Sequence, residues 1–252
     1  MKNEDDIRQF VPPAGSLEDR VIVITGAGGG LGSALAIASA RLGARVVLSG
    51  RTVRKLEAVY DEIIAGGGNR PSIAPLDLER ADASQYAALA DAVRNEYGRV
   101  DGLVHCAGLL GELAPIEHYD VVTWMRVMHV NVNASFILTR TLLPLLRLSE
   151  DGSVIFTTSG VSIKGRAYWG AYAVSKFAVE GLMQVLADEV DTTTAIRVNS
   201  VNPGKMRTPM RARAYPGEDP ETVPLPSEVL APFLFLLGAD GRSVTGQRFN
   251  AQ

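Results

Sequence analysis

The sequence contains a single cysteine, Cys106, among 252 residues, and it carries no excess of positive charge. A lone cysteine excludes an intrachain disulfide. The first ten residues are acidic and polar, whereas a secretory signal peptide begins with basic residues followed by an apolar stretch. Both features predict a protein of the reducing cytoplasm. The net charge of −3 lacks the basic footprint that binding to a phosphate backbone requires, so nucleic acid is not expected as a partner.

Long hydrophobic runs and metal-binding clusters are missing as well. The longest apolar stretches are interrupted well short of the roughly 20 residues that a membrane span needs, so no membrane association is expected. The three histidines, His105, His118 and His129, have no ligand spacing among themselves, and we expect no metal site. The sequence does have a hydrophobic content of 46%, which is enough to bury one substantial core.

From residue 20 onward, short β-branched apolar runs alternate with segments of helical periodicity. Because parallel strands need crossover connections, this alternation predicts an α/β protein with a Rossmann-like doubly wound parallel sheet of about seven strands and helices on both faces. Residues 1–19 show neither helical nor strand periodicity and are therefore expected to form an amino-terminal arm, which leaves 20–252 as a single domain. The expected strands are Val21–Thr25, Arg45–Ser49, Ser72–Leu76, Gly102–His105, Val154–Thr158, Ile196–Val201 and Gln247–Asn250. The expected helices are Ser33–Leu42, Val53–Ile64, Ala83–Tyr97, about 120–147, Gly170–Glu189 and Glu228–Leu237.

The segment 205–226 is the longest expected loop. A loop of that length in a compact domain is usually functional or mobile, so we expect it to close over a substrate. It carries the prolines Pro209, Pro216, Pro220, Pro224 and Pro226.

A glycine-rich loop, Thr25 to Gly32, joins the first expected strand to the first helix. Backbone N–H groups and the helix dipole at such a place can hold a pyrophosphate, and glycines let the backbone approach it. The spacing is not the common G-x-G-x-x-G, and a flexible turn without a ligand is the alternative. Its position after the first strand of an alternating sheet favours nucleotide binding.

The second expected strand ends without an acidic residue, in Leu48 to Thr52. Sites that prefer NAD place a carboxylate there for the ribose hydroxyls. Arg51 could instead form charge-assisted bonds with a 2′-phosphate, so NADP (NADPH) is favoured over NAD. The alternative is an ordinary solvated arginine at the start of a helix.

Tyr172 and Lys176 are four residues apart in an expected helix, so their side chains share one face. A phenol with a pKa near 10 is a poor acid-base catalyst at neutral pH, and a neighbouring ammonium favours its ionised form. The spacing alone is common by chance, and a surface tyrosine beside a solvated lysine is the alternative.

From about Asp19 to the carboxyl end, the order of motifs resembles the compact single-domain branch of the short-chain dehydrogenase/reductase family. Thr25 to Gly32 looks like its T-G-x-x-x-G-x-G cofactor loop, and Asn131 matches the helix asparagine of its proton relay. Ser159 lies thirteen residues before Tyr172, the family's usual interval. Further matches are Asp77-Leu78 after the third strand, His105-Cys106-Ala107-Gly108 in place of Asn-Asn-Ala-Gly, and Pro203-Gly204 with Thr208. Six motifs in the right order are unlikely to agree by accident.

The resemblance implies a hydride transfer between NADP(H) and a carbonyl or alcohol substrate. In that mechanism Tyr172 donates the proton, Ser159 orients the carbonyl oxygen, Lys176 lowers the tyrosine pKa and binds the nicotinamide ribose, and Asn131 connects Lys176 to solvent through water. The implied catalytic residues are Asn131, Ser159, Tyr172 and Lys176. The implied cofactor-binding residues are Gly26, Gly28, Gly29, Gly30, Leu31, Gly32, Arg51, Asp77, Leu78, Ala107, Gly108, Tyr172, Lys176, Pro203, Gly204 and Thr208.

Within the family, the segments 107–111, 169–172 and 206–219 look most like the bacterial YciK-type oxidoreductases. The resemblance implies a homodimer or homotetramer. Two departures are Cys106 in place of an asparagine and a chain end, Phe249 to Gln252, without the usual Asp-Gly-Gly. An NADP-sensing or interaction protein on the same fold, or an enzyme like the nucleotide-sugar epimerases and dehydratases, stays as an alternative.

Apolar residues flank these motifs and either line a substrate pocket or belong to the core. They are Leu109, Leu110, Leu113, Trp169 and Met206. Three arginines of the expected loop, Arg207, Arg211 and Arg213, either meet an acidic substrate or are simply solvated.

Overall fold

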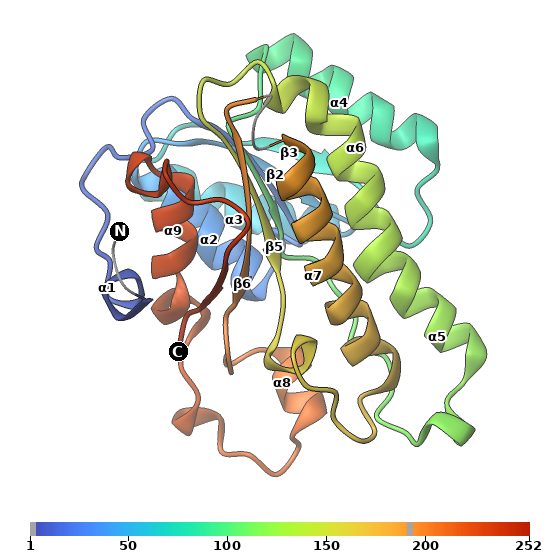
Figure 1. Cartoon of the computed structure of the whole chain (residues 1–252). Helices are drawn as coiled ribbons and strands as arrows, with labels where there is room; N and C mark the ends of the chain where they lie inside the picture. Colours follow the sequence, from blue (N-terminus) through green and yellow to red (C-terminus); the bar gives the residue numbers. More distant parts are fainter. Residues whose placement is uncertain (1–3, 191–193) are drawn as a thin grey trace.

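The computed structural model describes residues 4–190 and 194–252 (Figure 1). Seven parallel strands form one sheet in the order β3-β2-β1-β4-β5-β6-β7. This confirms the predicted doubly wound sheet. Its strands are β1 (Val21–Thr25), β2 (Arg45–Gly50), β3 (Ser72–Pro75), β4 (Gly102–His105), β5 (Gly152–Thr157), β6 (Ile196–Asn202) and β7 (Arg248–Asn250).

Helices cover both faces of the sheet, and each face has its own apolar core (Figure 1). Strand β1 is buried along its whole length because alternate side chains enter the two cores. One core contains buried residues of α2 (Gly30–Arg41), α3 (Val53–Ala65) and α9 (Ala231–Leu237). The other contains those of α4 (Ala83–Tyr97), α6 (Ala134–Leu146) and α7 (Gly170–Val190).

The helix expected at about 120–147 is interrupted in its middle. It consists of α5 (Val121–Met128), a π-helical turn at His129–Asn133 and α6. A π turn inserts one extra residue into the helix, and such turns occur frequently at functional sites. Here the turn contains the buried Asn131.

Two segments without expected periodicity contain short helices. In the amino-terminal arm, α1 (Glu4–Arg8) packs near α9, and Phe10 makes an edge contact with Phe235 at 5.4 Å between ring centroids. A helix of five residues with one apolar side chain, Ile7, is too short to show a period.

In the expected loop 205–226, α8 (Pro209–Ala214) begins at a cap formed by Thr208, whose hydroxyl accepts from the N–H of Arg211 at 3.2 Å. The expectation of an irregular loop is therefore wrong for these residues. The signal was present in the sequence, since a threonine followed by proline is a common start of a helix.

Buried charges hold the amino ends of the strands, at the opposite edge of the sheet from the expected site. The Asp151 carboxylate accepts from Arg197 at 2.8 Å and pairs with Arg20 and Arg242 at 3.2 Å. Burial lowers the pKa of Arg197, and Asp151 opposes this effect. Among the residues that the structure describes, no helix is both long and apolar enough to cross a membrane.

Candidate active site

Two adjoining hollows lie along the carboxyl ends of the strands. The larger, with a volume of about 360 Å³, contains Tyr172, Lys176 and Ser159 in its wall, and the smaller contains Arg51 and Asp77. Gly26, Ala107 and Gly108 line both hollows. Because β1 lies between β2 and β4, these shared residues mark the point where the strand order reverses, which is where ligands bind in open α/β sheets.

The glycine-rich loop follows β1 and packs tightly on its neighbours. Gly26 has φ +68°, and a Cβ there would lie 2.9 Å from the nitrogen of Ala107. A Cβ at Gly32 would collide with the carbonyl oxygen of Gly26, so both positions require glycine. No side chain caps α2, and Gly29, Gly30 and Leu31 of its first turn line the larger hollow. The first N–H groups of α2 are thus available to an anion.

Thr25 joins the ends of β1 and β4, a role that the sequence did not single out. Its hydroxyl accepts from the N–H groups of Cys106 at 3.1 Å and Ala107 at 3.2 Å. These bonds fix the turn that presents Ala107 and Gly108 to the hollows. The signals in the sequence were a hydroxyl at the end of an otherwise apolar strand and the threonine that opens the T-G-x-x-x-G-x-G motif.

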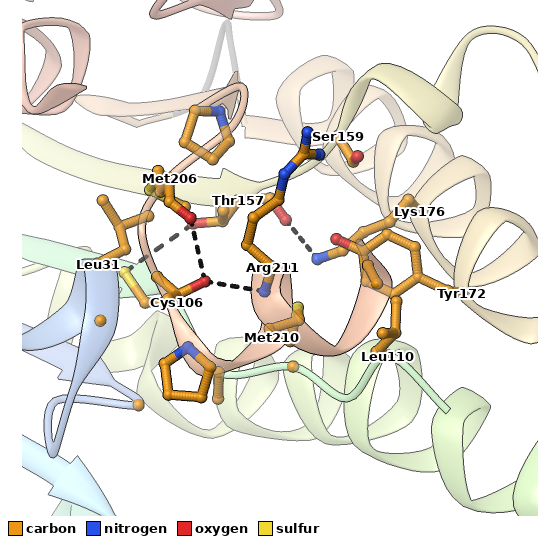
Figure 2. A pocket seen from close by; sticks show the side chains of 18 of the residues that line it. Leu31, Cys106, Leu110, Thr157, Ser159, Tyr172, Lys176, Met206, Met210 and Arg211 are labelled. Atoms are coloured by element: carbon orange, nitrogen blue, oxygen red, sulfur yellow. Dashed lines mark hydrogen bonds between the residues drawn. The ribbon is translucent and has the colours of Figure 1, made fainter. Parts of the chain in front are cut away.

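Tyr172, Lys176 and Ser159 meet in the larger hollow (Figure 2). Tyr172 and Lys176 lie in α7, and Ser159 follows the end of β5. The Nζ of Lys176 donates to the carbonyl oxygen of Thr157 at 2.7 Å and lies 5.7 Å from the centroid of the Tyr172 ring. Only 9% of Tyr172 and 6% of Lys176 is exposed, so solvent screens neither group.

Burial dominates the titration of both groups. It raises the pKa of Tyr172 above its ordinary value, while the hydrogen bond with Ser159 lowers that pKa in part. It lowers the pKa of Lys176 to about 8, against the opposing effects of Cys106 and Glu180. The group that lowers the tyrosine pKa in this structure is therefore Ser159, whereas the expectation had assigned that effect to Lys176. The raised pKa keeps the Tyr172 phenol protonated near pH 7.

Asn131 is buried in the π turn and does not itself line the larger hollow. Its side-chain oxygen accepts from the N–H of Leu109 at 2.7 Å, and its nitrogen donates to Leu109 O and to Ser175 Oγ, both at 2.9 Å. A Cβ added at Gly108 would lie 3.5 Å from this oxygen and 3.9 Å from Lys176 Nζ. All four expected catalytic residues are thus brought together, and the side-chain amide of Asn131 holds the segment after β4 against α7.

The smaller hollow lies beyond β2 and β3. Arg51 is exposed there and has no ion-pair partner within the described ranges. Asp77 accepts from the N–H of Glu79 at 3.1 Å, and Leu78 lines the same wall. Expected residues from the ends of both strands therefore face one space. Ser49 and Glu79 also line it and were not expected.

Pro203, Gly204 and Thr208 line the larger hollow after β6. The side-chain nitrogen of Gln252 donates to the carbonyl oxygens of Pro203 at 2.8 Å and Lys205 at 2.6 Å. The chain has Gln252 near the place of the family's Asp-Gly-Gly, and the side chain of this glutamine fixes the turn after β6.

The two residues that stand in place of the family's asparagines, His105 at the end of β4 and Cys106 directly after it, are both uncharged near neutral pH. Burial lowers the pKa of His105 to about 3, and its ring stacks on Phe156 at 4.9 Å and bonds to the Thr139 hydroxyl at 2.8 Å. Burial raises the pKa of the Cys106 thiol to about 12. Neither group can exchange a proton near neutral pH. No cluster of three or more metal-binding side chains occurs in the part of the chain that the structure describes.

The residues expected near the substrate divide into three groups. Leu110, Trp169 and Met206 line the larger hollow, Leu109 lines the smaller one, and Leu113 lines neither. Tyr215 and Met210 of the α8 region also line the larger hollow and were missed.

The strand order defines a doubly wound fold of the dinucleotide-binding class. A model of the short chain dehydrogenase family matches residues 20–219, and the chain therefore belongs to this family of oxidoreductases. It is 46% identical to the uncharacterized oxidoreductase YciK of Escherichia coli (strain K12), with 96% of each chain covered. This confirms the YciK-type resemblance.

Solved structures agree with this assignment. A short chain dehydrogenase from Pseudomonas syringae has a TM-score of 0.95 and 52% identity, with 96% of this chain and 98% of that chain covered. A short chain dehydrogenase from Shigella flexneri 2a, complexed with NADP, has a TM-score of 0.93 and 46% identity, with 95% of this chain and 100% of that chain covered.

Replacing Lys176 with methionine should change how stability depends on pH. With a pKa of about 8 in the folded chain and 10.5 as the ordinary value, the unfolded chain holds a proton between these values that the folded chain lacks. Wild-type stability therefore rises with pH in that window, by at most about 1.4 kcal/mol per pH unit. Urea unfolding at pH 7 and pH 9.5 should show the wild type gaining about 2 kcal/mol relative to Lys176→Met. The exposed-site control Lys164→Met should show no such change, and a constant difference for Lys176→Met would contradict the buried-ammonium assignment.

Proposed function

We propose that this protein is an NADP(H)-dependent carbonyl reductase or alcohol dehydrogenase. The observation that carries the proposal is the buried pair of Tyr172 and Lys176 with Ser159 beside it, next to the glycine-rich loop. The hollow that contains them adjoins a second one across the switch point of the sheet. A neutral phenol with a hydrogen-bonding serine is suited to give a proton to an oxygen that develops negative charge.

The residues present fit an NADP cofactor. The uncapped amino end of α2 supplies free N–H groups for the pyrophosphate, and the glycines leave room for its approach. Arg51, which has no acidic partner in the described part of the chain, would hold a 2′-phosphate. The NADP complex of the 46% identical Shigella flexneri protein supports the same choice.

Each site residue then has a defined task. Bound NADPH supplies the hydride. Tyr172 gives its proton to the substrate oxygen, which Ser159 holds by a hydrogen bond. Lys176 binds the nicotinamide ribose and returns a proton to Tyr172, and Asn131 positions the 108–110 segment and connects Lys176 to solvent through water. Reduction uses the protonated phenol, and the raised pKa keeps Tyr172 in that form at neutral pH.

We further propose a cytoplasmic homo-oligomer. Apolar side chains on α5, α6 and α7 are 43% to 75% exposed, and such a patch is typical of an interaction surface. They are Val121, Val122, Met125, Phe136, Val174, Phe177 and Val185.

Tyr172→Phe should lower the rate of NADPH-dependent carbonyl reduction by about a thousandfold, because it removes the proton donor and leaves the ring. NADPH binding, followed by fluorescence, should persist. The control Tyr168→Phe changes an exposed tyrosine outside the hollow and should keep full activity. Wild-type rates in Tyr172→Phe would show that another group donates the proton.

Arg51→Ala should weaken NADPH binding by about tenfold or more, because a charge-assisted contact to the 2′-phosphate is lost, and should leave NADH binding unchanged. Fluorescence titration with both nucleotides measures this. Arg54→Ala, an exposed change in the first turn of α3, serves as the control. Equal weakening of both nucleotides by Arg51→Ala would remove the support for NADP preference.

Val185→Glu should reduce the molar mass measured by light scattering after size exclusion, because it buries a charge in the proposed subunit interface. Ile64→Glu, on the exposed side of α3, should leave the mass unchanged. A wild type that runs as a monomer would refute the oligomer.

A further inference from the structure

Two cationic side chains, Lys176 and Arg211, line the larger hollow, yet the wall at its substrate end is mostly apolar. Apart from Tyr172, Ser159, Thr208 and Arg211, the side chains here are aromatic, aliphatic or thioether groups from three separate segments. They are Leu110, Trp169, Met206, Met210, Ala214 and Tyr215. Figure 2 shows Leu110 next to Tyr172 on one side and Met206 on the opposite side. The wall therefore offers apolar contact and few polar partners.

The cation nearest this wall, Arg211, is already neutralised. Its guanidinium binds both carboxylate oxygens of Glu218 at 2.6 Å, and it lies 3.7 Å from the centroid of the Tyr215 ring. This two-point pair is the strong geometry for arginine and carboxylate, and both side chains are only 24% exposed. A substrate carboxylate would have to displace Glu218 and leave it without its partner in a half-buried place.

The other arginines of the segment do not replace Arg211. Arg207 pairs with Glu221 at 2.9 Å, and Arg213, which points to the carbonyl oxygen of Gly111 at 3.4 Å, does not line the hollow. Of the two alternatives for these three arginines, the contacts of the loop therefore do not support the one in which they meet an acidic substrate. Among the described residues that line this hollow, Lys176 is the cation without a carboxylate partner, and it serves the reacting group. Arg166 lies outside the lining and is engaged with the Tyr215 hydroxyl.

Aromatic rings surround the space next to the proton donor. The Trp169 ring centroid lies 5.8 Å from that of Tyr172 and 5.9 Å from that of Tyr215, with interplanar angles of 58° and 45°. The Arg166 guanidinium lies 5.6 Å from both the Trp169 and the Tyr215 ring and donates to the Tyr215 hydroxyl. This contact holds the α8 segment against the loop before α7, so the two rings keep their positions around the substrate end.

We infer that the substrate is a neutral aldehyde or ketone whose carbonyl group is attached to, or part of, an aromatic or alicyclic ring, and that Trp169 and Tyr215 select the ring. The inference rests on the proposed function. Flat or compact rings gain contact from tilted aromatic walls, whereas a flexible chain must lose conformational freedom to pack on them. In the reaction the carbonyl carbon receives a hydride from NADPH, which becomes NADP⁺, the carbon-oxygen π bond breaks, and the oxygen takes the Tyr172 proton to give an alcohol.

Four aldehydes test this inference by NADPH oxidation. Benzaldehyde, cyclohexanecarbaldehyde and heptanal share seven carbons, and 4-carboxybenzaldehyde adds one charge. The wild type should have a kcat/KM about tenfold higher for the two neutral ring aldehydes than for heptanal, and about tenfold or more higher for benzaldehyde than for 4-carboxybenzaldehyde.

Two variants separate the ring and charge effects. Trp169→Leu should bring the ring aldehydes to within about twofold of heptanal, mainly through KM. The control Tyr168→Leu, which changes the neighbouring exposed ring outside the hollow, should keep the preference. Glu218→Gln frees Arg211 and should raise the kcat/KM for 4-carboxybenzaldehyde relative to benzaldehyde by about tenfold.

The outcomes are distinguishable from failure of the proposed function. Turnover of heptanal or 4-carboxybenzaldehyde at least equal to that of the neutral ring aldehydes would overturn the substrate class and keep the reductase. A ring preference that survives Trp169→Leu together with Tyr215→Leu would also overturn it. NADPH binding without turnover of any of the four aldehydes would count against both the reductase and its substrate class.

Discussion

The site depends on one constraint of the sheet, the reversal of strand order between β1 and β4. All strands are parallel, so every connection that leaves a carboxyl end starts at the same edge, and the reversal separates the loops after β1 and β4. The Thr25 hydroxyl holds the two loops in register by accepting from Cys106 and Ala107. Gly26 then turns where no larger residue would fit against Ala107. The continuous hollow exists because these two backbones approach each other and no side chain fills the gap.

The chemistry depends on burial more than on the pairing of Tyr172 with Lys176. An exposed lysine four residues from a tyrosine would be a solvated pair with little effect on either group. In α7, both side chains lie under the loops that follow β5 and β6, and burial shifts the two pKa values in opposite directions. The charged lysine is costly to bury, and its hydrogen bond to Thr157 and the field of Glu180 offset part of that cost. The protein thus keeps a proton donor and a cation side by side at neutral pH, at the expense of stability.

The sequence was sufficient for the sheet and for most of the site because both follow local rules. Strand β1 is a run of β-branched residues bounded by glycine, and the spacing from Tyr172 to Lys176 fixes their common face. The π turn around Asn131 could not be predicted, because its apolar period differs from that of an α-helix by a single residue. The contacts of Gln252 with residues 203 and 205, about fifty positions earlier, have no local signal either. Helix α8 did have a local signal, because Thr208 precedes Pro209, but the other prolines of the segment concealed it.

The α8 segment shows why charge on a substrate loop does not indicate a charged substrate. Arg211 and Glu218 are seven residues apart, and Arg207 and Glu221 are fourteen apart, so the segment carries the partners of two of its own arginines. Such internal pairs stabilise a short helix that has little core of its own, and they also remove free charge from the side that faces the hollow. The remaining recognition surface consists of the faces of Trp169 and Tyr215, which Arg166 joins. The selectivity that we infer would then depend on the shape of the substrate's ring and on the cost of separating Arg211 from Glu218. Neither effect requires an unpaired charge in the protein without its substrate.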